Sequence, residues 1–233
     1  MDIETAIQKI IDIEGISLGK LFNELQYSEV SNGKINKGYA GQLLLIAIGL
    51  PLDSKLLDLE DGEIKSTILK NDLTREWIPI TSLTHLLDDM ANDVPWEKTK
   101  VFEKLSHFLL VPCVKETSNW EEWHFTKPIE ISFKKNPDIF IKFKEDYDSI
   151  SSAVKNIIVT KGTLHTTNGP NYYLQIRTKD NKPYKPLVYR GQILADKKHA
   201  IGMTTRFVRK LVNDSRGTTS PKWHGKVPGK WEI

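Results

Sequence analysis

The chain has 233 residues and a formal net charge of +3, and its 39% hydrophobic and 27% charged residues are typical of a soluble globular protein rather than a disordered one. Its longest apolar run, residues 43–52, is about half of the ~20 residues that cross a bilayer, so we expect no membrane partner. A single cysteine, Cys113, excludes an internal disulfide and a cysteine-rich zinc site, and the acidic, amphipathic N-terminus has no signal-peptide pattern, so we expect a cytoplasmic protein.

The spacing of apolar residues predicts a mixed chain of helices and strands. In chain order, the first half is predicted to form helices over 3–13, 17–26 and 39–49, a turn and strand over 58–69, a strand over 77–80, a helix over 98–106 and a core strand over 107–114. The second half is predicted to form a strand pair or one long strand over 121–134, a helix over 137–156, strands near 157–160, 172–178 and 187–194, and a basic helix over 205–213. We therefore expect an α/β (α+β) protein, one domain with two lobes on either side of a cleft. Cys113, at the end of the core strand, is expected to be a buried structural thiol.

The charges are distributed unevenly along the chain. Residues 1–96 carry 8 Lys and Arg against 16 Asp and Glu, residues 97–154 carry 9 against 10, and residues 155–233 carry 16 against 4. The net charges of the three segments are therefore −8, −1 and +12. This distribution indicates a polyanion-binding face in the C-terminal third and a site that requires carboxylates in the N-terminal part. An unevenly composed, solvated surface would give the same counts, so the split alone favours nucleic acid only modestly.

The segment from Asp58 to Lys65 contains the most informative motif. Side chains alternate along a strand, so Glu63 and Lys65 are predicted to share one face, and Asp58 lies close enough in sequence to approach it. The two carboxylates and the Ile64 carbonyl would form a site of hard oxygen ligands suited to Mg²⁺. Lys65 would orient a water and offset charge on a phosphate, giving in-line hydrolysis of a phosphodiester. An exposed charged turn and strand would contain the same residues, and the motif alone favours that simpler interpretation.

Further segments place this motif in a wider pattern. They are, in order, SLGKL at 17–21, NKGYAGQLL at 36–44, SK at 54–55, the Asp58 to Lys65 motif, KL at 104–105, FLLVP at 108–112 and YLQIRTK at 173–179. This ordered set, which spans about residues 16–212, resembles the MutH family, with its KG-x-x-G-x-LL helix and its YLQIR-x-K segment. That family comprises the mismatch-repair nicking endonuclease and the Sau-type restriction endonucleases that cut at GATC.

The resemblance implies a restriction-endonuclease-like PD-(D/E)xK fold, with a mixed sheet flanked by helices. It implies a catalytic lobe over about 1–115, a DNA-gripping lobe over about 116–213 and a C-terminal extension over 214–233. The implied activity is Mg²⁺-dependent, sequence-specific cleavage of double-stranded DNA by a type II restriction endonuclease at a short site such as GATC. A homodimer on DNA is a further expectation.

The resemblance also assigns roles to individual residues. Asp58 and Glu63 match the metal-binding carboxylates, Lys65 the catalytic lysine and Lys104 a further active-site lysine. DNA contacts are implied for Lys37 near the backbone and for Arg177 and Lys179 in the loop that contacts the recognition sequence, where such side chains donate well to guanine. Two basic clusters, Lys197 with Lys198 and Arg206 with Arg209, are candidates for phosphate contact, with plain solvation an equal alternative.

The chain departs from the family pattern in two places. Leu45 stands where the family usually has a glutamate on the buried helix, and the nearby carboxylates Glu60 and Asp61 do not lie at the matching position. The region of the family's methylation-sensing tyrosine falls near residues 201–203, so methyl discrimination is not carried over. Two alternatives therefore stay open: a mismatch-repair nickase that needs a MutL-like activator, and a catalytically weak, site-specific DNA-binding module, for which Leu45 is the motive.

Overall fold

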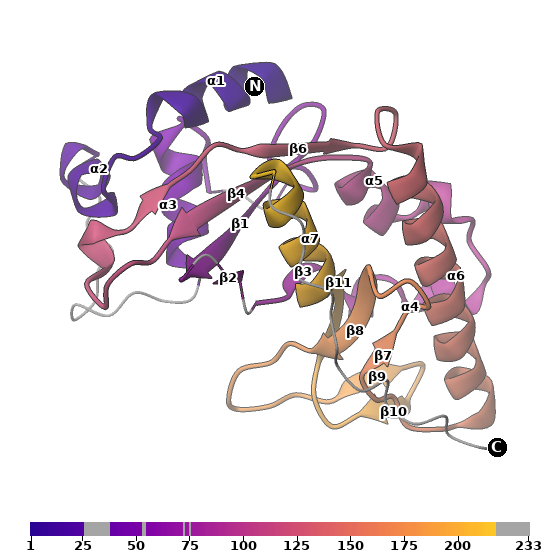
Figure 1. Cartoon of the computed structure of the whole chain (residues 1–233). Helices are drawn as coiled ribbons and strands as arrows, with labels where there is room; N and C mark the ends of the chain where they lie inside the picture. The colour runs from indigo at the N-terminus through magenta and orange to yellow at the C-terminus, as the bar shows by residue number, and fades with distance from the viewer. Residues whose placement is uncertain (26–37, 53–54, 72, 75, 218–233) are drawn as a thin grey trace.

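Two β-sheets form the framework of the molecule, with helices on their outer sides (Figure 1). The computed structural model describes residues 1–25, 38–52, 55–71, 73–74 and 76–217. In this part of the chain, no helix combines the length and the apolar composition that crossing a membrane requires. The architecture is mixed α/β of the α+β class, with a mixed sheet flanked by helices, as the sequence predicts.

The first sheet combines parallel and antiparallel pairing. In spatial order it contains β2 (Leu73–Thr74), β1 (Glu63–Lys70), β4 (His107–Val114) and β5 (His124–Phe125), and β6 (Ile129–Ser132) also pairs with β4. β1 and β4 run parallel, with Glu63 opposite Phe108, and the other pairs are antiparallel. Parallel neighbours need a long crossover connection, and the segment between β1 and β4 supplies a strand of the second sheet on its way.

The second sheet is antiparallel, in the order β3 (Ile78–Ser82), β11 (His199–Met203), β8 (Leu174–Thr178) and β7 (Thr167–Asn168). A separate hairpin joins β9 (Leu187–Tyr189) to β10 (Gln192–Ala195), and its turn residues Arg190 and Gly191 have φ of 47° and 84°, as a type I′ turn requires. The sheets exchange segments across the predicted lobe boundary near residue 115: β3 precedes it but joins the second sheet, while β5 and β6 follow it but extend the first.

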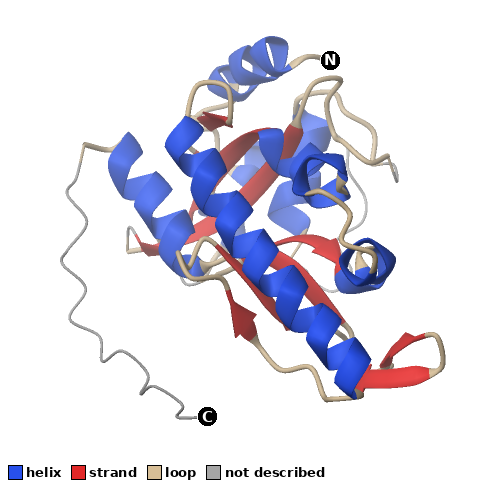
Figure 2. Cartoon of the chain, turned by 90° about the vertical axis from the view of Figure 1, so that its right-hand side faces the viewer, coloured by secondary structure: helices blue, strands red, loops and turns tan. Residues whose placement is uncertain are grey.

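Helices cover both faces of the first sheet. On one face lie α1 (Ile3–Asp12), α2 (Leu18–Glu24) and α3 (Tyr39–Ala47), and the other face contacts α5 (Lys100–Ser106) and α7 (Thr205–Ser215). α4 (Leu87–Ala91) packs on α6 (Pro137–Thr160), which runs from the first sheet to the β9–β10 hairpin (Figure 2). Short 3₁₀ turns lie at Leu83–His85, Trp96–Lys98 and Trp120–Glu122.

Alternation along β1 and β4 divides the interior into two cores. Ile64, Leu109 and Cys113 belong to the core beneath α1–α3, whereas Phe108 and Leu110 belong to the core that contains α5, α6, α7 and the second sheet. A strand buried on both faces reads as a continuous apolar run, which is why residues 107–114 are predictable as a core strand. Glu63 and Lys65, two residues apart on β1, lie on the α5 side of the sheet, because Ile64 between them faces α1–α3.

Cys113 is buried as predicted, and burial raises the pKa of its thiol to about 12. A thiol with a raised pKa stays protonated through neutral pH, and only the thiolate is nucleophilic. We therefore expect no reaction of the native protein with a thiol-selective chromogenic reagent at pH 8 and one equivalent reacting after denaturation. Rapid labelling of the native protein would contradict this placement.

Several secondary-structure predictions differ from the structure. The single strand predicted over 187–194 is wrong, because a turn at Arg190 and Gly191 divides these residues into β9 and β10, which pair as a hairpin. The helix α4 was not predicted.

The strand predicted near 157–160 is wrong, because these residues continue α6 to Thr160, and Lys161 ends the helix in the left-handed conformation with φ of 55°. The β-branched residues there favour a strand locally, but Ile157 and Ile158 pack against the larger core from the helix.

β11 was not predicted, although it is the strand between β3 and β8. A Cβ on its Gly202 would lie 2.3 Å from the Ile78 carbonyl oxygen, so the close approach of β3 requires glycine.

A buried carboxylate on α6 fixes the start of β8. Asp146 is fully buried, and it accepts hydrogen bonds from the amides of Asn171 (2.6 Å), Tyr173 (2.6 Å) and Leu174 (2.8 Å). Gly169 packs so tightly against this side chain that a Cβ there would lie 2.2 Å from the Asp146 Cγ. Asp146 therefore joins α6 to the start of β8 through the backbone amides of that segment.

We expect Asp146→Ala to lower the free energy of unfolding by about 3–5 kcal/mol, because it leaves three amide donors, two of them buried, without acceptors. Urea denaturation followed by circular dichroism measures this change. Asp148→Ala is the matched control: this exposed carboxylate lies on the same helix and pairs with Lys144 at 3.4 Å. We expect the control to change stability by no more than about 0.5 kcal/mol, and equal effects of the two variants would contradict the role of Asp146.

Candidate active site and basic face

The turn before β1 brings Asp58 to the first residues of the strand. The Leu59 amide donates to the Gly62 carbonyl at 2.9 Å, and the Ile64 amide donates to Asp58 Oδ2 at 3.0 Å. Gly62 is required at this point, because a Cβ would lie 2.4 Å from Ile3 Cδ1 and 2.6 Å from the His107 carbonyl oxygen. The turn therefore folds Asp58 back onto the face where Glu63 begins the strand.

The ammonium of Lys65 is surrounded by oxygen atoms. It forms an ion pair with Glu63 Oε1, lies 3.2 Å from the Ile64 carbonyl oxygen and lies 3.8 Å from Asp58 Oδ2. These are the three groups that the sequence predicts as metal ligands. The ammonium therefore occupies the position that the predicted ligands surround.

Lys104 completes the cluster from the neighbouring helix α5. It lies on α5 shortly before β4, and its Nζ contacts Glu63 Oε1 at 2.7 Å. Glu63 is only 1% exposed, and its second oxygen, Oε2, is buried and has no hydrogen-bond partner among the described residues. A buried carboxylate oxygen without a partner is energetically costly. Asp58, Glu63, Lys65 and Lys104, all predicted as site residues, are brought together.

This donor set suits Mg²⁺. The ion prefers oxygen ligands, is usually held by one or two carboxylates and keeps several waters. Asp58, Glu63 and the Ile64 carbonyl provide such ligands, and the partnerless Oε2 leaves one lone-pair group of Glu63 available. Over the described part of the chain, no cluster of three or more His, Cys, Asp or Glu side chains is placed to hold a metal. A site here would therefore depend on two carboxylates, a carbonyl and water.

The nearby carboxylates do not replace the missing helix glutamate. Leu45 on α3 packs against the core beneath α1–α3. Glu60 pairs with the α-amino group of Met1 at 2.5 Å, and Asp61 accepts a hydrogen bond from the Ile3 amide at 2.8 Å. Both acids therefore hold the start of α1 rather than adding a third carboxylate to the cluster.

No protein-family model matches the chain, and the search of curated proteins finds no match. The assignment of these residues therefore depends on the motif and on the geometry of the cluster.

Four of the predicted DNA-binding residues, Arg177, Lys179, Lys197 and Lys198, lie on or next to β8 and β11 of the second sheet, whereas Arg206 and Arg209 lie on α7. Arg177 and Lys179 lie at and beyond the end of β8, and Arg177 alternates with core residues, so it faces away from the core. Burial lowers the pKa of Lys179, and the charge of Lys65 lowers it further, so the two lysines are near neighbours electrostatically. The charge of Lys65 therefore acts on the segment that resembles the recognition loop. Lys37 lies outside the described residues.

The remaining candidates have different surroundings. Lys198 is exposed, the Lys197 ammonium lies 4.3 Å from the centre of the Tyr184 ring, and the exposed Arg206 lies 5.6 Å from that of Tyr172. Arg209 is half-buried, and its Nε donates to the Thr74 carbonyl oxygen at 2.7 Å. That bond gives Arg209 a structural role in joining α7 to β2.

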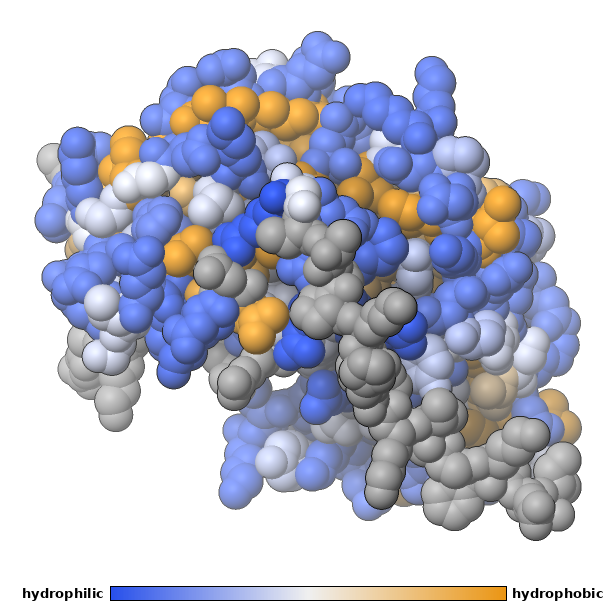
Figure 3. Space-filling view, in the orientation of Figure 1, coloured by the Kyte–Doolittle hydropathy of each residue, from blue (hydrophilic) through white to orange (hydrophobic). Residues whose placement is uncertain are grey.

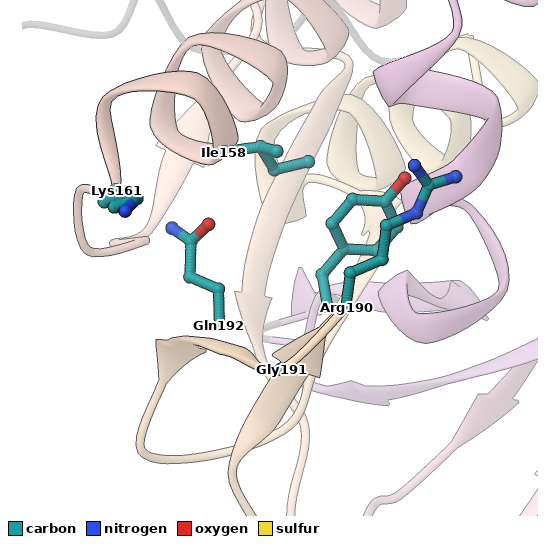
Figure 4. A pocket seen from close by; sticks show the side chains of 6 residues that line it. Ile158, Lys161, Arg190, Gly191 and Gln192 are labelled. Carbon is teal, nitrogen blue, oxygen red and sulfur yellow. The ribbon is translucent and has the colours of Figure 1, made fainter.

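The surface is hollowed between the candidate active site on β1 and the loop after β8. Figure 3 shows an indentation between the part of the molecule that contains β1 and β2 and the part that contains the loop after β8. A separate open cavity of about 510 Å³ lies between the end of α6 and the β9–β10 turn (Figure 4). It is lined by Ile158, Lys161, Tyr189, Arg190, Gly191 and Gln192, and none of the four cluster residues contributes to it. It is therefore a different feature from the candidate active site.

Asp180, which was not predicted as a site residue, accepts hydrogen bonds from three backbone amides beside Lys179. Two signals were available. Asp180 is one of only four acids in the basic C-terminal third, and it precedes Asn181 in a Pro-containing loop, where Asp commonly bonds to nearby amides.

Proposed function

We propose that this chain is a Mg²⁺-dependent, sequence-specific endonuclease for double-stranded DNA, of the type II restriction class, with a short site such as GATC. The observation that carries the proposal is the buried Glu63 carboxylate. One of its oxygens, Oε1, is shared by Lys65 and Lys104, and the other, Oε2, is buried and has no hydrogen-bond partner among the described residues. A PD-(D/E)xK fold, and a homodimer on a two-fold symmetric site, are part of the same proposal.

The residues of the cluster have distinct roles in phosphodiester hydrolysis. Asp58, Glu63 and the Ile64 carbonyl would hold Mg²⁺, which when bound polarises a phosphate oxygen and acidifies water. Lys104 neutralises and orients Glu63. Lys65 contacts the non-bridging oxygens of the phosphate and offsets the charge that develops there as water oxygen bonds to phosphorus and the bond to the leaving sugar oxygen breaks.

The basic face supplies the affinity and the reading of bases. This face comprises the end of β8, the loop after it and the turn before β11, with the cations Arg177, Lys179, Lys182, Lys185, Lys197 and Lys198. The C-terminal third of the sequence, residues 155–233, carries the net charge of +12, and cations that neutralise phosphates release counterions and favour binding. Arg177 projects from the outer face of β8, where its guanidinium is available to the edge of a guanine. The electrostatic proximity of Lys179 to Lys65 links base reading to the catalytic cluster.

Digestion of methylated and unmethylated plasmid DNA tests the proposal. With Mg²⁺ we expect discrete fragments whose sequenced ends share one short site, and with EDTA we expect none. Nicked circles that appear only with an added activator would assign the repair alternative. Absence of any product, with and without methylation, would contradict the nuclease proposal.

A second candidate is a site-specific DNA-binding module that does not cleave. Leu45 favours it, because a leucine stands where a glutamate would add a third carboxylate to the cluster. Lys65 and Lys104 also favour it, because they already neutralise the charge of Glu63 that a metal ion would need. Sequence-specific retention of DNA that is independent of Mg²⁺, without products, would identify this function. Mg²⁺ binding that Asp58→Ala abolishes would count against it.

A further inference from the structure

Asp180 joins two separate segments of the basic face. Its Oδ1 accepts the Asn181 amide at 2.9 Å, and its Oδ2 accepts the Lys185 amide at 2.9 Å and the Lys198 amide at 3.1 Å. The first two amides belong to the loop after β8, and the third belongs to the turn before β11. One carboxylate therefore holds together two segments that are distant in sequence.

The segments that Asp180 joins are rich in cations. Lys179 precedes it, Lys182 and Lys185 lie in the loop, and Lys197 and Lys198 lie in the turn. A further backbone bond, from the Lys179 amide to the Lys198 carbonyl oxygen at 2.9 Å, reinforces the same junction. The position of Lys179, beside the end of β8, is thus set by the junction that Asp180 holds.

A carboxylate at this place opposes the charge that the face needs for a polyanion. Only Asp180, Asp196, Asp214 and Glu232 are acidic in residues 155–233. An anion among lysines repels DNA phosphates, so Asp180 does not add to affinity by its charge. Its amide bonds lower the pKa of Asp180, the Lys185 bond most strongly, so the side chain is ionised at neutral pH and its hydrogen bonds are charge-assisted.

We propose that Asp180 is a positioning residue for sequence recognition: it fixes the loop after β8 against the turn before β11, so that Lys179 meets base edges in one arrangement. The inference rests on the proposed function. Base readout depends on donors held in a defined geometry, whereas attraction to phosphates does not. Asp180 therefore increases discrimination between sequences while its charge weakens binding to any DNA.

Asp180→Asn and Asp196→Asn separate these two effects. Each removes one negative charge from the same face. Asp196 is exposed in the turn between β10 and β11, and its side chain has no hydrogen bond or ion pair with the described residues. In Asp180→Asn, an amide NH₂ replaces one carboxylate oxygen and cannot accept, so the variant loses at least the Asn181 bond, and the neutral oxygen that remains accepts from the Lys185 and Lys198 amides more weakly than a carboxylate oxygen does.

The probe is a duplex library with a randomised central segment, retained by the protein in EDTA and then sequenced. We expect both variants to bind the unselected library as tightly as the parent or more tightly, because each removes repulsion. Only Asp180→Asn should lose enrichment of the preferred sequence, by about tenfold or more, on the scale of one disrupted base contact. Equal enrichment by both variants would overturn the proposal.

Amide hydrogen exchange provides a second readout that needs no DNA. The Lys185 and Lys198 amides should exchange faster in Asp180→Asn than in the parent and in Asp196→Asn, with the rest of β8 unchanged. Unchanged exchange would overturn the clamp itself. If the parent protein binds no DNA, the proposed function fails and the recognition role fails with it, while faster exchange would still establish the clamp, so the two failures are distinguishable.

Discussion

Glu63→Gln should reduce Mg²⁺-dependent DNA cleavage about a thousandfold or more and leave the chain folded. A neutral amide keeps the shape of the side chain but removes the charge that binds a divalent cation. Losing several kcal/mol of transition-state stabilisation corresponds to a rate loss of this size. Lys65 and Lys104 would then lie together without the anion that neutralises them, which also weakens their positioning.

Single-turnover cleavage of a supercoiled plasmid measures the effect, and circular dichroism checks the fold. Glu60→Gln is the matched control, since Glu60 precedes the same strand but pairs with the α-amino group of Met1. We expect the control to cleave at the rate of the parent. If Glu63→Gln cleaved as well as Glu60→Gln, Glu63 would have no part in metal binding, and the endonuclease proposal would fail.

The fold was predictable where local pattern and burial agree. The apolar run over 107–114 predicts β4, and the apolar spacing over residues 3–13 predicts α1, because both patterns face a core directly. β11 has the same burial but contains Gly202, which weakens the local preference for a strand. Its place between β3 and β8 depends on pairing with residues far away in sequence, so a local pattern cannot reveal it.

The candidate site was predictable where its residues share one element. Period-two alternation places Glu63 and Lys65 on one face, and the turn at Gly62 explains why Asp58 joins them. Lys104 comes from a different element, the helix α5, and its prediction depended on the resemblance to the MutH family alone. Asp180 was not predicted because its partners are backbone amides. Every residue except proline has such an amide, so the residues that donate to Asp180 form no recognisable sequence motif.

The contacts of Lys65 lead to the second large effect. Its ammonium occupies the space between Glu63 Oε1, the Ile64 carbonyl and Asp58 Oδ2, the oxygens that a metal ion would use. A divalent cation and this ammonium therefore compete for the same ligands. Removing the ammonium should strengthen metal binding even as it removes the group that contacts the phosphate.

Lys65→Met is accordingly expected to reduce cleavage about a hundredfold or more and to increase the affinity for Mg²⁺ without DNA about tenfold or more, which is about 1.4 kcal/mol. Titration calorimetry measures the affinity separately from activity. Lys104→Met is the control, because among the described residues the Lys104 ammonium contacts Glu63 Oε1 alone, and the variant leaves Lys65 in place, so its gain in affinity should be smaller. Unchanged or weaker Mg²⁺ binding by Lys65→Met would contradict the competition.

If Lys65→Met binds Mg²⁺ more tightly, the Mg²⁺ affinity of the parent protein should depend on whether DNA is bound. A phosphate that attracts Lys65 away from Glu63 and Asp58 would free their oxygens, so DNA should tighten metal binding in the parent protein. By linkage, Mg²⁺ should then tighten DNA binding by the same factor. In Lys65→Met this mutual effect should shrink, because the ammonium that couples the two ligands is gone.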